Sequence, residues 1–261
     1  MPRLPQLALC ALIPLVLSGC GSSSSGGDTA SKPPKQILSD VQSAVAKVHS
    51  YHLAGTITDK DGPGQLVGDV AAPSSLRFTI KQGGRAAQLV VTGSNAYLRA
   101  SRSFWQSQGG IPAKAIKLLS NRWVKVPASA KGGPGDLVEE FAPKNFARCL
   151  ASQTGTVTKG GTKTFSGQKV VVLQDKGDKP GTNPGQLYIA ASGPALPLRV
   201  LQTGPQKPGG SADPTCGGGS DTTKSADVRL SNFDKDVKIS APPGALDLQK
   251  LAAGGGSTNS A

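Results

Sequence analysis

The stretch Leu76-Arg77-Phe78-Thr79-Ile80-Lys81 decides the fold class of this chain, because apolar and polar residues alternate through it without a break. Strict alternation places successive side chains on opposite faces of a β-strand. The same period continues at 66–70 before this stretch and at 89–91 after it, followed by Tyr97. Short turn signals interrupt the series at Asp61-Gly62-Pro63-Gly64, Gly83-Gly84 and Gly93-Ser94-Asn95. Short turns between alternating segments predict antiparallel hairpins with one apolar and one solvated face.

Working outward, similar alternation predicts further strands at 187–189, 196–200, 228–230 and 237–239. Residues that favour extended structure predict others at 51–58, 123–126 and 170–173. Helical spacing of apolar residues occurs at 37–48, after Pro112, and at 137–150 with a break near Pro143. A meander of about nine to eleven strands must curl, because long twisted sheets do not stay open and flat. The expected fold class is therefore α+β, a curved antiparallel β half-barrel wrapped over three helical segments.

The N-terminus has the features of an export signal. Arg3 precedes an apolar run that begins near Leu7 and ends in Leu17-Ser18-Gly19-Cys20. The run is too short to span a bilayer as a helix, which needs about 20 residues. A cysteine directly after Leu-Ser-Gly resembles a bacterial lipobox. This resemblance implies that cleavage makes Cys20 the first residue and that its sulfur carries a diacylglycerol group with acyl chains such as palmitate; the alternative is a plain secretory signal.

Composition along the chain predicts four segments. Residues 1–19 form the lipoprotein signal peptide, and residues 20–35 form a Ser/Gly/Pro tether that cannot bury enough apolar surface to fold. Residues 36–250 form one folded domain, and the Gly/Ser-rich residues 251–261 form a disordered tail. Aromatic residues make up only 4% of the chain, so the core of the domain must be mainly aliphatic.

The formal net charge of +13 favours anionic partners. The basic residues are scattered and lack the interleaved aromatic residues that stack nucleic-acid bases, so we expect no nucleic-acid partner. Outside the cytoplasm, the available anionic partners are lipid headgroups and wall polymers.

Two of the four cysteines remain for the folded domain, since Cys10 leaves with the signal peptide and Cys20 would carry lipid. Cys149 and Cys216 then form the one possible pair, in a compartment where disulfides persist. We expect a disulfide between them; two free buried thiols are the alternative.

The sequence offers no set of residues that indicates catalysis. The two histidines, His49 and His52, have no nearby carboxylate or cysteine in the sequence to complete a metal site. No G-x-S-x-G nucleophile motif and no correctly spaced phosphate loop occur. We therefore expect no enzyme activity, no metal and no cofactor. Trp105 and Trp123 are expected either in the core or at the border of a cavity.

Several segments of the domain resemble a known family in order and pattern: Thr164-Phe165-Ser166-Gly167, then 186–191, then 196–200, and the closing 233–243. Together with the lipobox, the tether and the first helix, they are similar to the actinobacterial LppX/LprA/LprF/LprG lipoproteins, which have the LolA-like half-barrel. The resemblance covers roughly residues 36–250. It implies a protein on the extracytoplasmic face of the cell membrane that holds acyl chains of a lipid or glycolipid between sheet and helices and transfers them. A further partner would be a transporter or another envelope protein.

We expect the inward-facing apolar residues of the strands and helical segments to line this cavity, although alternation alone leaves the opposite strand face open. They are Leu76, Phe78, Ile80, Leu89, Val91, Ile111, Leu118, Phe141, Phe146, Leu198 and Val200. Two rival functions are a lipid-sensing envelope regulator, which would expose an apolar patch for a partner protein, and a structural envelope lipoprotein without a ligand, whose core would be filled.

Overall fold

The computed structural model describes residues 28–128, 134–152, 154–209, 216, 223–248 and 250. The predicted signal peptide, residues 20–27 of the predicted tether with Cys20, and the tail 251–261 lie outside the described residues. So do the Gly-rich loop at 129–133 and most of the Gly-rich insertion at 203–222.

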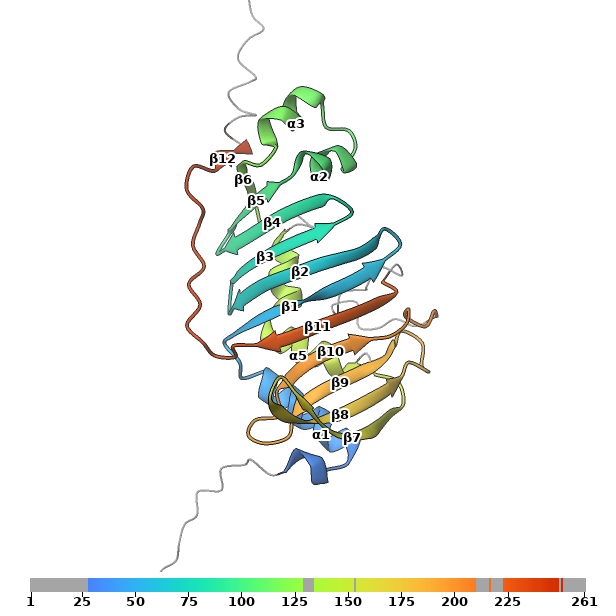
Figure 1. Ribbon diagram of the computed structural model, residues 1–261. Helices are drawn as coiled ribbons and strands as arrows, with labels where there is room; N and C mark the ends of the chain where they lie inside the picture. Colours follow the sequence, from blue (N-terminus) through green and yellow to red (C-terminus); the bar gives the residue numbers. More distant parts are fainter. Residues whose placement is uncertain are drawn as a thin grey trace, which may run out of the picture.

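A single twelve-stranded sheet dominates the described part of the chain (Figure 1). Its strand order is β12-β6-β5-β4-β3-β2-β1-β11-β10-β9-β8-β7, and every neighbouring pair is antiparallel except β12 and β6. The strands are β1 (Ser50–Asp59), β2 (Gly62–Ala71), β3 (Ser75–Gln82), β4 (Arg85–Thr92), β5 (Asn95–Ala100), β6 (Trp123–Pro127), β7 (Val157–Phe165), β8 (Gln168–Lys176), β9 (Pro184–Ala190), β10 (Pro197–Gln202), β11 (Ser225–Ser231) and β12 (Leu246–Asp247). The central pair β1–β11 joins two meanders, which we call the N-terminal half (β1–β6) and the C-terminal half (β7–β11).

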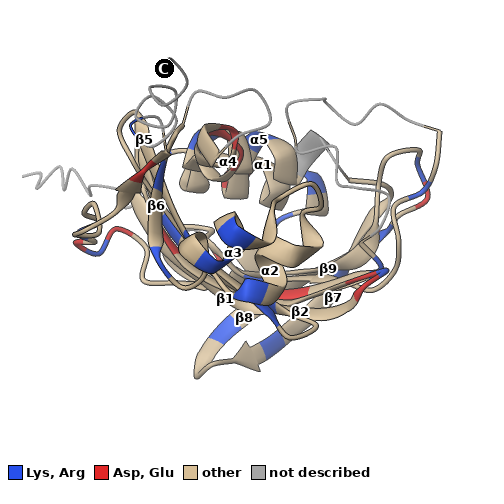
Figure 2. Cartoon of the chain, turned by 90° about the horizontal axis from the view of Figure 1, so that it is seen from above, with Lys and Arg blue, Asp and Glu red and all other residues tan. Residues whose placement is uncertain are grey.

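The sheet curves around a group of helices, as the view along its long axis shows (Figure 2). After a short 3₁₀ turn, η1 (Thr29–Ser31), the helices are α1 (Pro34–Val45), α2 (Arg102–Ser107), α3 (Ala113–Leu119), α4 (Pro134–Phe141) and α5 (Pro143–Ser152). Helices α1, α4 and α5 lie inside the curve, whereas α2 and α3 lie at the end of the molecule that carries β5 and β6 (Figures 1 and 2). This is the predicted α+β curved half-barrel.

Helix α1 forms as its apolar spacing predicts. Pro34 occupies the first helical position, where its missing N–H costs no hydrogen bond. Ile37, Val41 and Val45 recur every four residues and are buried against the C-terminal half of the sheet, in a core that includes Val171. Burial of this one stripe holds the helix in place.

The N-terminal half is closed by tight packing between the sheet and α4. Phe78 on β3 is 2% exposed, and its ring meets that of Phe141 edge to face with 4.8 Å between centroids. Gly68, opposite Phe78 on β2, has no side chain where a Cβ would lie 1.9 Å from the Phe78 ring. The glycine therefore makes the space that lets Phe78 reach the helix.

The structure differs from the predicted elements in four places. The count of twelve strands among the described residues exceeds the expected nine to eleven. Strand β7 was not predicted because only its ends, Val157 and Phe165, are large and apolar, and α2 is too short to develop a helical stripe. The predicted strand at 237–239 is wrong: this part of the chain pairs with no strand and runs along the strand ends from β11 to β12 (Figure 1).

Candidate functional site

A pocket with a volume of about 360 Å³ lies between the helices and the C-terminal half of the sheet. Such a volume falls in the range of small-molecule sites, about 300–1,000 Å³. Its roof comes from α1, α4 and α5, and its floor comes from β8, β9 and β10. The side chains around it are mostly apolar, so it provides an environment for hydrocarbon.

The roof is fixed by aromatic contacts and by a disulfide. Phe146 on α5 stacks on Tyr51 with 5.8 Å between centroids, and the Tyr51 hydroxyl donates a 2.6 Å hydrogen bond to the Phe141 carbonyl. Burial, followed by the nearby charge of Glu140, raises the pKa of Tyr51, which keeps the phenol protonated as a donor. Cys149 on α5 is bonded to Cys216, and both line the pocket. The expected disulfide is therefore present.

The apolar side chains of the floor include Leu173, Leu187 and Val200, which lie opposite one another on the neighbouring strands β8, β9 and β10. Val200 was a predicted cavity residue, but Leu198 on the same strand was placed on the wrong face. Leu198 packs with Val170, Val172 and Tyr188 on the convex side of the sheet. The pairing of β10 with β9 shifts register between Pro197 and Arg199, and this bulge inserts one residue and so reverses the alternation.

Two carboxyl groups lie among the polar side chains of the pocket. Burial raises the pKa of the Glu140 carboxyl. Burial also raises the pKa of Asp175, although backbone N–H groups of Gly177 and Gly155 donate to its carboxylate at 2.8 and 3.0 Å. Asn183 Oδ1 is buried and has no hydrogen-bond partner within the described chain. A buried acceptor without a partner is unusual, and a hydroxyl or amide of a ligand would satisfy it.

No Lys, Arg or His occurs among the described residues that line this pocket, although the chain carries 29 Lys and Arg residues against 16 acidic ones. The pocket therefore contrasts in charge with the protein as a whole. Its described residues offer carboxyl groups, amides and hydroxyls to a ligand, and none of them offers a cation to an anionic headgroup.

The structure brings three of the predicted cavity residues to the pocket: Phe141, Phe146 and Val200. The others lie elsewhere. Leu76, Phe78, Leu89 and Val91 are buried in the packed core beneath α4, and Ile111 packs against the small core under α2 and α3. Ile80 and Leu118 are 44% and 42% exposed. The predicted residues are displaced from the pocket because α4 fills the N-terminal half of the concave face.

Pocket residues that the sequence analysis did not single out include Leu38, Leu150, Asp175 and Asn183. Leu150 belongs to the helical stripe that the sequence does reveal, and Leu187 to a predicted strand. Asp175 lies near the end of β8 and Asn183 lies in the loop before β9. The sequence indicates a Gly/Pro-rich turn there, but it does not indicate where these two side chains point.

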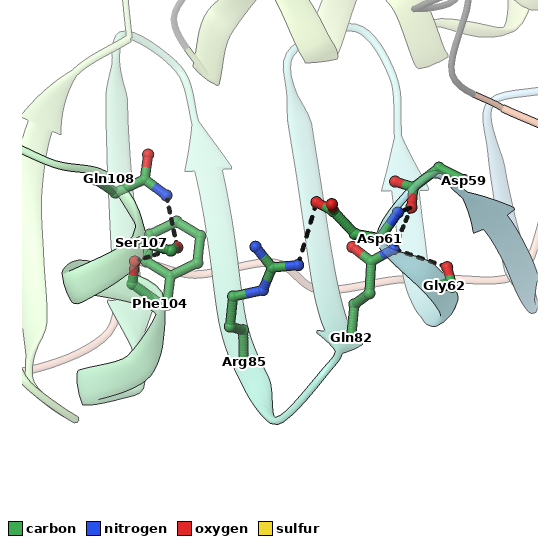
Figure 3. A network of polar contacts seen from close by, with 8 residues as sticks. All are labelled: Asp59, Asp61, Gly62, Gln82, Arg85, Phe104, Ser107 and Gln108. Carbon is green, nitrogen blue, oxygen red and sulfur yellow. Dashed lines mark hydrogen bonds and ion pairs between the residues drawn. The ribbon is translucent and has the colours of Figure 1, made fainter.

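A second hollow, of about 470 Å³, lies at the ends of β1–β4 and is lined by polar residues and glycines. Figure 3 shows the contacts that surround it: Arg85 contacts Asp61 at 3.3 Å, and Gln82 donates to Asp59 and to the Gly62 carbonyl. These contacts tie two hairpin turns together. The hollow lies at the surface beside these turns and is separate from the pocket over β8–β10.

Each histidine contacts a carboxylate from a distant part of the sequence. His52 lies 2.8 Å from Asp69, which Arg77 also contacts, so these three form a row across β1, β2 and β3. His49 lies 3.4 Å from Asp234. Trp105 is 8% exposed and packs in the core under α2 and α3. Among the described residues, no helix has the length and apolar character needed to cross a membrane.

No family model and no curated protein matches this chain. Among solved structures, the chain is similar to LprF from Mycobacterium bovis at 19% identity and a TM-score of 0.51, covering 80% of this chain and 97% of that one. The lipoprotein LppX from Mycobacterium tuberculosis aligns at 14% identity and a TM-score of 0.48, over 79% of this chain and 100% of that one. The likeness to LprF confirms the fold that the sequence resemblance implied.

Proposed function

We propose that this chain is a lipoprotein, held through Cys20 on the extracytoplasmic face of the cell membrane, that binds and transfers a lipid or glycolipid. The Leu-Ser-Gly-Cys sequence at 17–20 supports the anchor. The observation that carries the proposal is the apolar pocket between α5 and β8–β10, which is large enough for part of an acyl chain. Burial of hydrocarbon there yields about 25 cal/mol per Å² of apolar surface.

The charge of the pocket points to a ligand with a neutral, hydroxyl-bearing headgroup. Glu140, Asp175 and the free oxygen of Asn183 can accept hydrogen bonds from sugar or glycerol hydroxyls. An anionic phosphate or a fatty-acid carboxylate would find two carboxyl groups and no cation among the described lining residues. A glycolipid or acylglycerol therefore fits better than a phospholipid or a free fatty acid.

We also propose that the protein does not catalyse a reaction. Asp175 is engaged by the backbone of Gly155 and Gly177 and so stabilises the loops at the end of β8. A carrier needs only binding and release, and neither requires a nucleophile paired to a base.

Native mass spectrometry of the full acylated chain, purified from its own host in mild detergent, tests the proposal. We expect a population heavier than the acylated polypeptide by one lipid of defined mass. Val200→Trp should reduce that population, since an indole that displaces two methylene groups removes about 1.6 kcal/mol, or roughly a fifteenfold loss of affinity.

Leu198→Trp is the matched control, because Leu198 lies two residues away on the opposite face. We expect it to keep its lipid. A clean mass for the unmodified chain, with no uptake of added glycolipid or acylglycerol, would contradict the carrier function and favour a regulator or structural protein.

A further inference from the structure

Charge is segregated along this chain. Between Asp69 and Asp136 the sequence contains no acidic residue but ten basic ones, which is most of the net charge of +13. The segment forms β3–β6 with α2 and α3. The ten residues are Arg77, Lys81, Arg85, Arg99, Arg102, Lys114, Lys117, Arg122, Lys125 and Lys131.

Four of these cations gather on the α2–α3 hairpin, defined here as residues 102–122. Arg102, Lys114, Lys117 and Arg122 are all exposed, and no ion pair engages any of them in the part of the chain that the structure describes. Figure 2 shows basic segments and no acidic segment on these two helices. Their mutual repulsion is uncompensated within the described protein, so an external anion would stabilise the hairpin.

Helix α3 adds an apolar group to this basic surface. Its inner face is fixed by Ile116 and Leu119, which are each 8% exposed. Lys114 and Leu118 are four residues apart and therefore lie on one face of the helix. Leu118 is 42% exposed beside Lys117, so the outer face presents cations around an aliphatic side chain. Helices that lie on membrane surfaces share this combination.

The hairpin is firmly held and projects from the end of the molecule. The Ser101 hydroxyl caps α2 by accepting the Phe104 N–H at 3.2 Å, and Ser103 donates to the Gly84 carbonyl at 2.9 Å. Figure 1 places α2 and α3 beyond β5 and β6, at the opposite end of the sheet from α1 and η1. No described element covers the outer face of α3, so a flat surface can approach it.

We propose that the α2–α3 hairpin docks onto an anionic lipid bilayer. Several cations spread over a projecting surface suit a field of headgroups better than one small anion, and Leu118 can enter the headgroup boundary. Each Lys or Arg near an anionic bilayer strengthens binding about fivefold. This surface lies outside the pocket, so the inference goes beyond the proposed cargo and does not depend on it.

Vesicle sedimentation tests the docking with the full chain carrying Cys20→Ala, in which no acyl group holds the protein to a bilayer. Binding to vesicles of equal parts phosphatidylcholine and phosphatidylglycerol is compared with binding to phosphatidylcholine alone, which subtracts any insertion of the N-terminal apolar run. We expect a clear preference for the anionic vesicles. It should fall steeply as salt rises from about 0.1 M to about 1 M, because the Debye length shrinks from about 10 Å to about 3 Å.

The double variant Lys114→Glu/Lys117→Glu should weaken binding to anionic vesicles at least about tenfold. Lys35→Glu/Lys169→Glu makes the same change in net charge at exposed positions elsewhere and should retain most of the binding. Lys114→Gln/Lys117→Gln gives a milder test if charge reversal perturbs folding. Equal binding to both vesicle types, or an equal loss in the control variant, would overturn the proposal. Binding of the same variants to a soluble polyanion, polyphosphate, is measured in parallel. If Lys114→Glu/Lys117→Glu weakened binding to polyphosphate but not to anionic vesicles, the proposal would also be overturned.

Discussion

The two halves of the concave face differ in how completely the helices fill the space above the sheet. In the N-terminal half, α4 inserts Phe141 against Phe78, and the residues beneath it are nearly inaccessible. In the C-terminal half, α1 and α5 lie over β8–β10 but leave a pocket of about 360 Å³. One curved sheet therefore carries a filled core beside an open one.

The difference indicates that curvature alone does not make a cavity. The sheet is lined by aliphatic residues along its whole length, and the position of each helix decides whether they meet side chains or space. Net charge differs between them as well, because the stretch between Asp69 and Asp136 carries ten basic residues and no acidic one, whereas none of the described pocket residues is basic.

Truncating one leucine in each half would test this division most strongly. Leu76→Ala removes a fully buried side chain and should lower the free energy of unfolding by about 3–5 kcal/mol. Leu187→Ala enlarges an existing pocket and should cost less than about 2 kcal/mol. Denaturant unfolding measures both. Equal losses would mean that the C-terminal half is as tightly packed as the N-terminal half.

Removing the disulfide should affect one half more than the other. Cys149→Ser/Cys216→Ser opens a closed loop with a sequence separation of 67, and we expect a loss of about 2–4 kcal/mol. Hydrogen exchange should report faster opening of β8–β10 than of β3–β5, because the bond joins the pocket roof within the C-terminal half. A uniform loss of protection across the sheet would contradict this expectation.

The smallest effect concerns an ion pair on the convex face. Arg199 donates two hydrogen bonds of 2.7 Å to Asp227, which lowers the pKa of Asp227. Because the folded pKa lies below the unfolded one, the stabilisation is complete at neutral pH and is lost as pH falls through the folded value. Asp227→Asn should cost about 1 kcal/mol at pH 7, a figure reduced for solvent screening of this partly exposed pair.

Thermal unfolding over a pH series measures this difference, which should shrink in acid below the usual Asp pKa of about 3.9. Asp69→Asn provides the corresponding change in the N-terminal half, since His52 and Arg77 lower the pKa of Asp69 against the opposing effect of burial. A cost for Asp227→Asn that stays constant with pH would rule out the ionised pair as its source.

Much of the fold could be predicted from the sequence, because alternation and turns are local properties. Leu76 and Phe78 lie on the predicted apolar face, and Ile37, Val41 and Val45 form the predicted helical stripe. The disulfide followed from the small number of cysteines available for pairing.

The position of the pocket could not be predicted, because it depends on which strands each helix covers. Leu198 illustrates a second limit. The one residue inserted between Pro197 and Arg199 reverses which face of the sheet the preceding side chains of the strand occupy, and alternation in the sequence does not reveal such a bulge. Val237 and Ile239 illustrate a third limit. Alternation identifies a segment that is able to form a strand, but it does not show whether a neighbouring strand is available to pair with that segment.

The pairing of β1 with β11 also sets the order in which this protein can be completed. Strands β1 to β5 pair with their neighbours in sequence, so this meander can form before the later residues have been made. Strand β1 then keeps an open row of N–H and C=O groups until residues 225–231 arrive to pair with 52–58. Such distant pairing forms slowly, and an open edge invites pairing with other chains. We therefore expect newly made chains to depend on dilution or on a holding chaperone until their last long strand is in place.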